Sequence, residues 1–215
     1  VVGASWAGAA YMFDVDPLSP SFGSEIATFS APGSSFGSMS AVAIDGDLAV
    51  AAFPDGGASG KAFLFEVNTG KTLFMLTAPE VRSSDDFGVS VSIFGDRFIV
   101  GSRFDDTAGL DSGAAYVFDA FDGSFLLKLT AGDASPDDSF GISVGIRDNV
   151  AVVGANRVMI SGERAGAAYL YNAVPEPHAV CLFAIGALLA CSARHRHARS
   201  APAKCLFERG PRFHR

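Results

Sequence analysis

The stretch "GAAYVFD", Gly113 to Asp119, decides the fold, because nearly the same letters occur three more times. The other copies are "GAAYMFD" from Gly8, "GKAFLFE" from Gly60 and "GAAYLYN" from Gly166. The aromatic residues of the four copies, Tyr11, Phe63, Tyr116 and Tyr169, are 52, 53 and 53 residues apart. A fixed spacing of this size is typical of a repeat protein in which each unit is one supersecondary element.

The unit around this stretch has the pattern of four strands. It opens with Phe87-Gly88, after which apolar and small residues alternate, and this is the period of a half-buried strand. Gly95-Asp96 and Asp122-Gly123 predict tight hairpin turns. We therefore expect antiparallel strands at 88–94, 97–102, 113–120 and 124–131.

These patterns predict an all-β fold. A single four-stranded sheet cannot bury both faces, so the copies must stack side by side, as the blades of a β-propeller do. The expected units are about 1–35, 36–86, 87–139 and 140–173, which give fourteen strands, or about 3.5 blades, with both end blades incomplete. We interpret the chain as part of a longer protein or as a misread frame; a self-contained four-bladed ring is the alternative.

Composition divides the chain into an acidic body and a basic end. Residues 1–173 carry 21 acidic and 9 basic side chains, and residues 174–215 carry 2 and 7. An acidic body argues against a nucleic-acid partner, because phosphates would be repelled. All four histidines and all three cysteines follow residue 173, so the body offers neither a His base nor a Cys nucleophile, and its metal ligands could only be oxygen atoms.

The repeat resembles a known family. Phe-Gly opens the units at Phe36, Phe87 and Phe140, and Val-Gly-Ala or a close variant follows in the second strand. This order is similar to the FG-GAP repeat of integrin α-chain propellers and their bacterial relatives, and the resemblance covers residues 1–173. It implies blades of four strands whose loops bind a partner.

The loop at 103–113 is a candidate calcium site. It offers Asp105, Asp106 and Asp111 between two strands. Integrin-like propellers hold calcium in this loop, so the resemblance implies Ca²⁺ ligation by these carboxylates, in keeping with the oxygen ligands that the ion prefers. The alternative is a turn in which Asp and Gly suit the backbone.

Two acidic loops raise the question of catalysis. Asp85-Asp86 precedes one Phe-Gly pair, and Asp137-Asp138 precedes the next. Paired carboxylates could cleave a glycoside. Their recurrence at one position of the repeat instead favours turn capping on a solvated rim, so we expect no enzymatic activity.

The end of the chain has the pattern of a sorting signal. Val174, Pro175, Glu176 and Pro177 end the globular body, because proline interrupts strands and helices. Fifteen uncharged, mostly apolar residues follow at 179–193, and then a basic cluster of Arg194, Arg196 and Arg199, which is expected to stay cytoplasmic.

This order resembles the PEP-CTERM signal of bacterial exported proteins. The resemblance implies a hydrophobic membrane helix within 174–199, cleavage by a membrane exosortase and release to the cell surface. We expect residues 200–215 to be a basic, disordered tail. The alternative is a buried core helix, which the flanking Pro and Arg residues disfavour.

Two functions remain open from the sequence. The first is an exported, non-catalytic propeller that serves as a surface or matrix scaffold and binds a protein or a polysaccharide. The second is a propeller-based hydrolase that acts on extracellular polysaccharide, which would require a carboxylate pair on one blade only.

Overall fold

A computed structural model describes residues 2–4, 9–30, 40–54, 60–80 and 84–172. The chain divides into two units, Val1–Pro177 and His178–Arg215, and every described residue lies in the first. The predicted hydrophobic helix and the basic tail therefore lie outside the described residues. Within those ranges, no helix is long and apolar enough to cross a bilayer.

The described part is all-β, and its sheets are antiparallel. The first sheet contains β1 (Val2–Ala4), β2 (Ala9–Phe13) and β3 (Glu25–Ser30). The second contains β4 (Ala41–Asp45), β5 (Leu48–Phe53), β6 (Lys61–Glu66) and β7 (Thr72–Leu76). The third contains β8 (Phe87–Phe94), β9 (Arg97–Ser102), β10 (Ala114–Asp119) and β11 (Phe125–Leu129). The fourth contains β12 (Phe140–Arg147), β13 (Val150–Ala155) and β16 (Ala167–Asn172).

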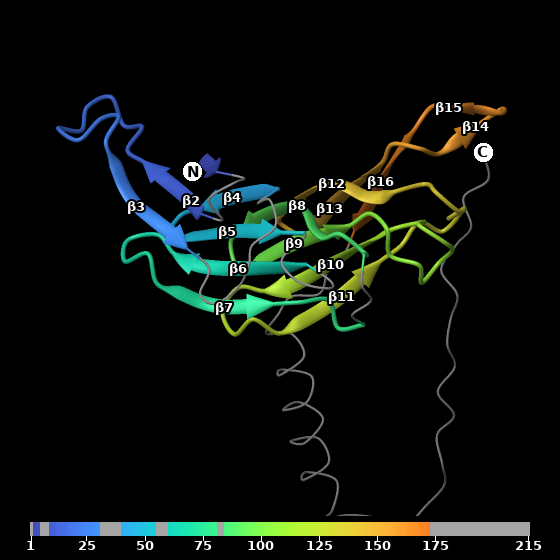
Figure 1. Cartoon of the computed structure of the whole chain (residues 1–215), viewed down its shortest axis with the longest axis horizontal. Coiled ribbons are helices and arrows are strands. Elements are labelled where there is room, and N and C mark those ends of the chain that lie inside the picture. Colours follow the sequence, from blue (N-terminus) through green and yellow to red (C-terminus); the bar gives the residue numbers. More distant parts are fainter. Residues whose placement is uncertain (1, 5–8, 31–39, 55–59, 81–83, 173–215) are drawn as a thin grey trace, which may run out of the picture. The chain divides into compact units, whose positions relative to one another are not determined.

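The second and third sheets confirm the four-stranded repeat, and the first and fourth have three strands each, as expected for the end units. Figure 1 labels the strands of the second and third sheets. The strand count differs from the prediction, because the described residues contain sixteen strands rather than fourteen. The extra pair is a short hairpin of β14 (Met159–Ile160) and β15 (Glu163–Arg164) in the loop before β16. Ser161 and Gly162 both have positive φ, 54° and 86°, which is the backbone of a tight two-residue hairpin turn.

Neighbouring sheets bury their faces against each other, as the stacking argument predicts. Strands β4, β8 and β12, the first of their sheets, are in contact with one another in that order. The third sheet contributes side chains to two hydrophobic cores, one on each face. In strand β10, Tyr116 and Phe118 pack toward the second sheet. Ala115 and Val117 pack toward the fourth sheet. All six residues of β10 are buried for this reason.

The glycine that begins each aromatic stretch lies against the Phe-Gly pair of the next unit at the junction between sheets. The backbone N–H of Phe140 donates to the carbonyl oxygen of Ser112 at 2.9 Å, so the chain entering the fourth sheet lies against the end of the loop in the third. Gly113 has φ +86°, and a Cβ atom placed on it would collide with the carbonyl oxygen of Phe140. Gly60 makes the same approach to Phe87 one unit earlier. Glycine is therefore required at this position of the repeat.

Candidate functional site

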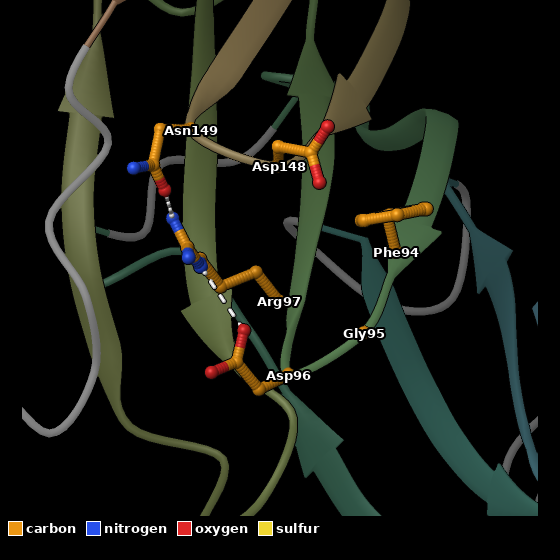
Figure 2. Close-up of a pocket in the computed structure, with 6 residues that line it drawn as sticks. All are labelled: Phe94, Gly95, Asp96, Arg97, Asp148 and Asn149. Carbon is orange, nitrogen blue, oxygen red and sulfur yellow. Dashed lines mark hydrogen bonds and ion pairs between the residues drawn. The ribbon is translucent and has the colours of Figure 1, made fainter.

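A polar pocket lies where two sheets meet, at the hairpin turns β8–β9 and β12–β13. It has a volume of about 380 Å³ and is lined by Phe94, Gly95, Asp96, Arg97, Asp148 and Asn149. Figure 2 shows the Arg97 guanidinium between two partners, one from each sheet. Its Nε donates to Asp96 Oδ1 at 3.1 Å, and its Nη1 donates to Asn149 Oδ1, also at 3.1 Å.

Arg97 is a buried cation at a position where the other repeats are apolar. It is the first residue of β9, and Leu48 and Val150 begin β5 and β13 in the same way. Among the strands that the structure describes, a cation therefore begins the second strand of the third sheet only. It combines a guanidinium, two carboxylates, an amide and the Phe94 ring. Groups of this kind bind polar ligands by hydrogen bonds. Neither a histidine nor a cysteine lines this pocket, so it lacks the usual nucleophile–base pairs.

The loop that carries the predicted calcium ligands lies at the other end of β9. Asp105 is buried, with 1% of its surface exposed, and its carboxylate faces the third sheet. Oδ2 accepts hydrogen bonds from the Tyr116 hydroxyl and, at 3.0 Å, from Lys128 Nζ. Oδ1 accepts a hydrogen bond from the backbone N–H of Thr107 at 2.9 Å. The lysine ammonium thus already neutralises the buried carboxylate.

The ionisation of this cluster follows from its burial and its hydrogen bonds. Burial alone would raise the pKa of the Asp105 carboxyl, but hydrogen bonds from Tyr116, Thr107 and Lys128 outweigh it and lower the pKa below the usual value. Burial, together with the hydrogen bond to Asp105 and its negative charge, raises the pKa of the Tyr116 hydroxyl well above its usual value. At neutral pH the site therefore holds an ionised carboxylate and a neutral phenol.

The other two predicted ligands serve the loop backbone. Asp106 Oδ1 accepts a hydrogen bond from the N–H of Asp111 at 2.8 Å, and Asp111 has the left-handed backbone of a turn, with φ +51°. Among the described residues, the structure contains no group of three or more His, Cys, Asp or Glu side chains that could hold a metal ion. Calcium binding by Asp105, Asp106 and Asp111 stays a prediction.

Calorimetric titration tests the calcium prediction directly. If the loop binds calcium, the protein releases or absorbs heat when millimolar Ca²⁺ is added, and Asp111→Asn abolishes it, because the amide keeps the size and the left-handed backbone but removes a charged ligand. Asp122→Asn, in the β10–β11 turn, is the matched control and should leave the heat unchanged. A protein that shows no heat at millimolar Ca²⁺ has no such site.

The two carboxylate pairs lie at the entries to β8 and β12 and share one equivalent position, because Asp85 corresponds to Asp138 at the 53-residue spacing, whereas Asp86 corresponds to Ser139. Ser84 and Asp86 have positive φ, and so do Asp137 and Ser139, their equivalents 53 residues later. One carboxylate of each pair is held in place by the protein itself. Asp86 Oδ2 accepts Arg103 Nη2 at 2.7 Å, and Asp138 Oδ2 accepts the backbone N–H of Ser135 at 2.8 Å.

The carbonyl groups of these acidic segments also repeat their contacts. The oxygen of Asp85 accepts the N–H of Phe104 at 3.3 Å, and the oxygen of Asp138 accepts the N–H of Arg157 at 3.2 Å. Asp85 and Asp138, the equivalent members of the two pairs, thus link the segment that enters each sheet to the loop of the same sheet. The predicted sorting residues Val174, Pro175, Glu176 and Pro177, and the basic residues Arg194, Arg196 and Arg199, lie outside the described residues.

Comparison with known proteins agrees with this architecture. Residues 74–118 and 124–171 match the FG-GAP repeat, so the chain contains two copies of this repeat. Each match begins near the outer strand of one sheet and ends in the third strand of the next, and it therefore spans a junction between sheets. The two matches support the FG-GAP repeat that the sequence resembles.

The similarity to solved structures concerns the fold alone. A computationally designed protein, Ika4, aligns with a TM-score of 0.53 over 80% of this chain and 82% of its own, at 15% identity. No curated protein matches the sequence. The described sheets are therefore β-propeller-like, and the function must be argued from the sites.

Proposed function

We propose that this chain is an exported, non-catalytic β-propeller protein that serves as a scaffold or adhesion protein of the bacterial cell surface or extracellular matrix. The C-terminal signal delivers it to a membrane exosortase. Its ligand is a surface protein or a polysaccharide, bound by loops and turns at the junctions between sheets.

The hydrogen-bond partners of the paired carboxylates are the main support for this proposal. A glycosidase needs two carboxyl groups that are free to protonate the substrate and to attack it or activate water. Asp86 is instead paired with Arg103, and Asp138 accepts a hydrogen bond from the backbone N–H of Ser135. These structural partners, together with the recurring backbone contacts of Asp85 and Asp138, favour a role in folding over a role in chemistry.

The pocket at Arg97 supports a binding role. It combines residues from the third and fourth sheets, and its cation departs from the repeat. Repeat proteins place binding residues where individual units differ, because the shared positions serve packing. A sugar hydroxyl could donate a hydrogen bond to the carboxylates that line this pocket, and a carbonyl group could accept one from the Asn149 amide nitrogen.

A glycan panel that reports both binding and turnover tests the function. We expect the full chain to bind a surface polysaccharide or an extracted surface protein without releasing reducing ends. Arg97→Leu, which inserts the residue found at the first position of β5, should weaken binding at least about tenfold, because the pocket loses its cation. Turnover that disappears in Asp137→Asn or Asp138→Asn would identify a hydrolase and overturn the proposal.

Replacement of the sorting motif tests the route of export. With Pro175, Glu176 and Pro177 changed to alanine, we expect an uncleaved precursor in the membrane fraction, because the exosortase no longer recognises its substrate. Immunoblotting of membrane and surface fractions measures this. Substitution of Pro202, beyond the basic cluster, is the control. A mature size unchanged by the motif substitution would contradict the sorting assignment.

A further inference from the structure

The hairpin turn between β12 and β13 places a carboxylate in the polar pocket, at a position where the other repeats have glycine. Gly46, Gly95 and Asp148 each follow the last residue of the first strand in their sheets, and all three have positive φ, at 55°, 58° and 50°. Glycine adopts this backbone without steric cost, whereas aspartate adopts it with some strain. The turn therefore does not need the Asp148 side chain in order to fold.

The Asp148 carboxylate is available to a ligand. It is exposed, it lines the pocket, and it accepts no hydrogen bond from the residues that the structure describes. At the preceding junction a carboxylate instead ties the two neighbouring turns together, because Asp45 Oδ2 accepts the backbone N–H of Gly95 at 2.6 Å. Phe94 takes the place of Asp45 at the pocket, and its ring cannot accept such a bond. The pocket therefore lies where this link between turns is missing.

Arg97 orients two further polar groups of the pocket. Its guanidinium donates to Oδ1 of Asp96 and to Oδ1 of Asn149, as Figure 2 shows. Within the described part of the chain, Asp96 Oδ2 and Asn149 Nδ2 make no hydrogen bond of their own. The residues that line the pocket therefore offer acceptors on Asp96 and Asp148 and a donor on Asn149.

Charges of both signs border the pocket, and they disfavour a ligand that is itself charged. Asp96 and Asp148 would repel a uronate, a sulfate or a phosphate. Arg147, whose guanidinium lies 5.6 Å from the centre of the Phe94 ring, and the buried Arg97 would repel an ammonium group. A neutral sugar avoids both penalties. Its hydroxyls can donate to the carboxylates and accept from the amide, and its C–H groups can contact the aromatic ring.

We propose that the Arg97 pocket binds one sugar unit of a neutral polysaccharide, and that Asp148 is the residue that selects it. The volume of about 380 Å³ is near the lower end of the range of about 300–1,000 Å³ that is typical of small-molecule sites, which suits a single sugar ring. The inference rests on the proposed function and deepens it, because it names the ligand class of that binding site.

Two substitutions of Asp148 distinguish the ligand classes. Affinity electrophoresis of the full chain uses dextran, mannan and galactan as neutral probes, polygalacturonate as the anionic probe and chitosan as the cationic probe. We expect binding to a neutral probe. Asp148→Gly, which inserts the residue of the other two hairpins, should weaken it at least about tenfold, because a charge-assisted hydrogen bond is lost. Asp148→Asn should weaken it less, because the amide oxygen still accepts a hydrogen bond.

A matched control and the charged probes make the test decisive. Asp16→Asn, at an exposed residue between β2 and β3, should bind as the wild type does. Binding only to polygalacturonate, strengthened by both substitutions, or only to chitosan, weakened equally by both, would overturn the ligand class and leave the scaffold function standing. Neutral binding unchanged in Asp148→Gly, or no binding to any probe, also overturns the inference. In that case, binding of an extracted surface protein would still support the proposed function, whereas release of reducing ends would contradict it.

Discussion

Replacement of Gly113 by alanine is expected to lower the free energy of unfolding by at least about 3 kcal/mol. Two costs add at this residue. Its φ of +86° is a conformation that residues with a side chain rarely adopt, and the new methyl group would collide with the backbone of Phe140. The clash cannot be relieved by a side-chain rotation, so the third and fourth sheets would have to separate. Urea denaturation followed by circular dichroism measures the loss.

Gly46→Ala separates the two costs. Gly46 also has positive φ, +55°, but a Cβ atom there meets open space. This variant should lose only about 1 kcal/mol, the cost of the left-handed backbone alone. Equal losses in the two variants would mean that the close approach at the sheet junction contributes nothing to stability.

The fold could be predicted from the sequence because the strand pattern of one sheet occurs four times along the chain. Strand 97–102 was predicted at the bounds of β9, and the other three strands of that unit agree to within about two residues at each end. A single copy of "GAAYVFD" would fit a buried strand of many folds. Because the stretch recurs together with Phe-Gly at a constant distance, the sequence predicts a sheet that packs on copies of itself.

The candidate site was harder to predict, because it depends on departures from the repeat. Arg97 was assigned only to a strand, although a charged residue in a position occupied by Leu48 and Val150 was a visible signal. The partners of Asp105 could not be predicted, since Lys128 is 23 residues away and reaches it only after β10 and β11 pair. The expected strands do not include the β14–β15 hairpin, although Ser161-Gly162 is a dipeptide typical of a tight turn.

Replacement of Lys128 by methionine should destabilise the protein by about 3 kcal/mol at neutral pH. Lys128 Nζ lies 3.0 Å from Asp105 Oδ2, and the carboxylate would remain buried without its cation. The loss should shrink in acid. In the wild type the low pKa of Asp105 contributes stability above the ordinary carboxyl pKa, and this contribution fades as the pH falls through the lowered value. The variant keeps the hydrogen bonds from Tyr116 and Thr107 but loses the part of this contribution that Lys128 supplies, so the gap between the two unfolding curves should narrow as the pH falls below about 4.

A triple variant shows whether the cost comes from the isolated charge or from lost packing. Lys128→Met, Asp105→Val and Tyr116→Phe insert residues that the other sheets have at these positions, namely Met75, Val158 and Phe63. An apolar replacement of the whole cluster leaves no buried charge unpaired, so most of the lost stability should return. Thermal unfolding of the wild type, the single variant and the triple variant at pH 7 makes the comparison. If the triple variant is less stable than Lys128→Met alone, the cluster stabilises the sheet by more than charge neutralisation.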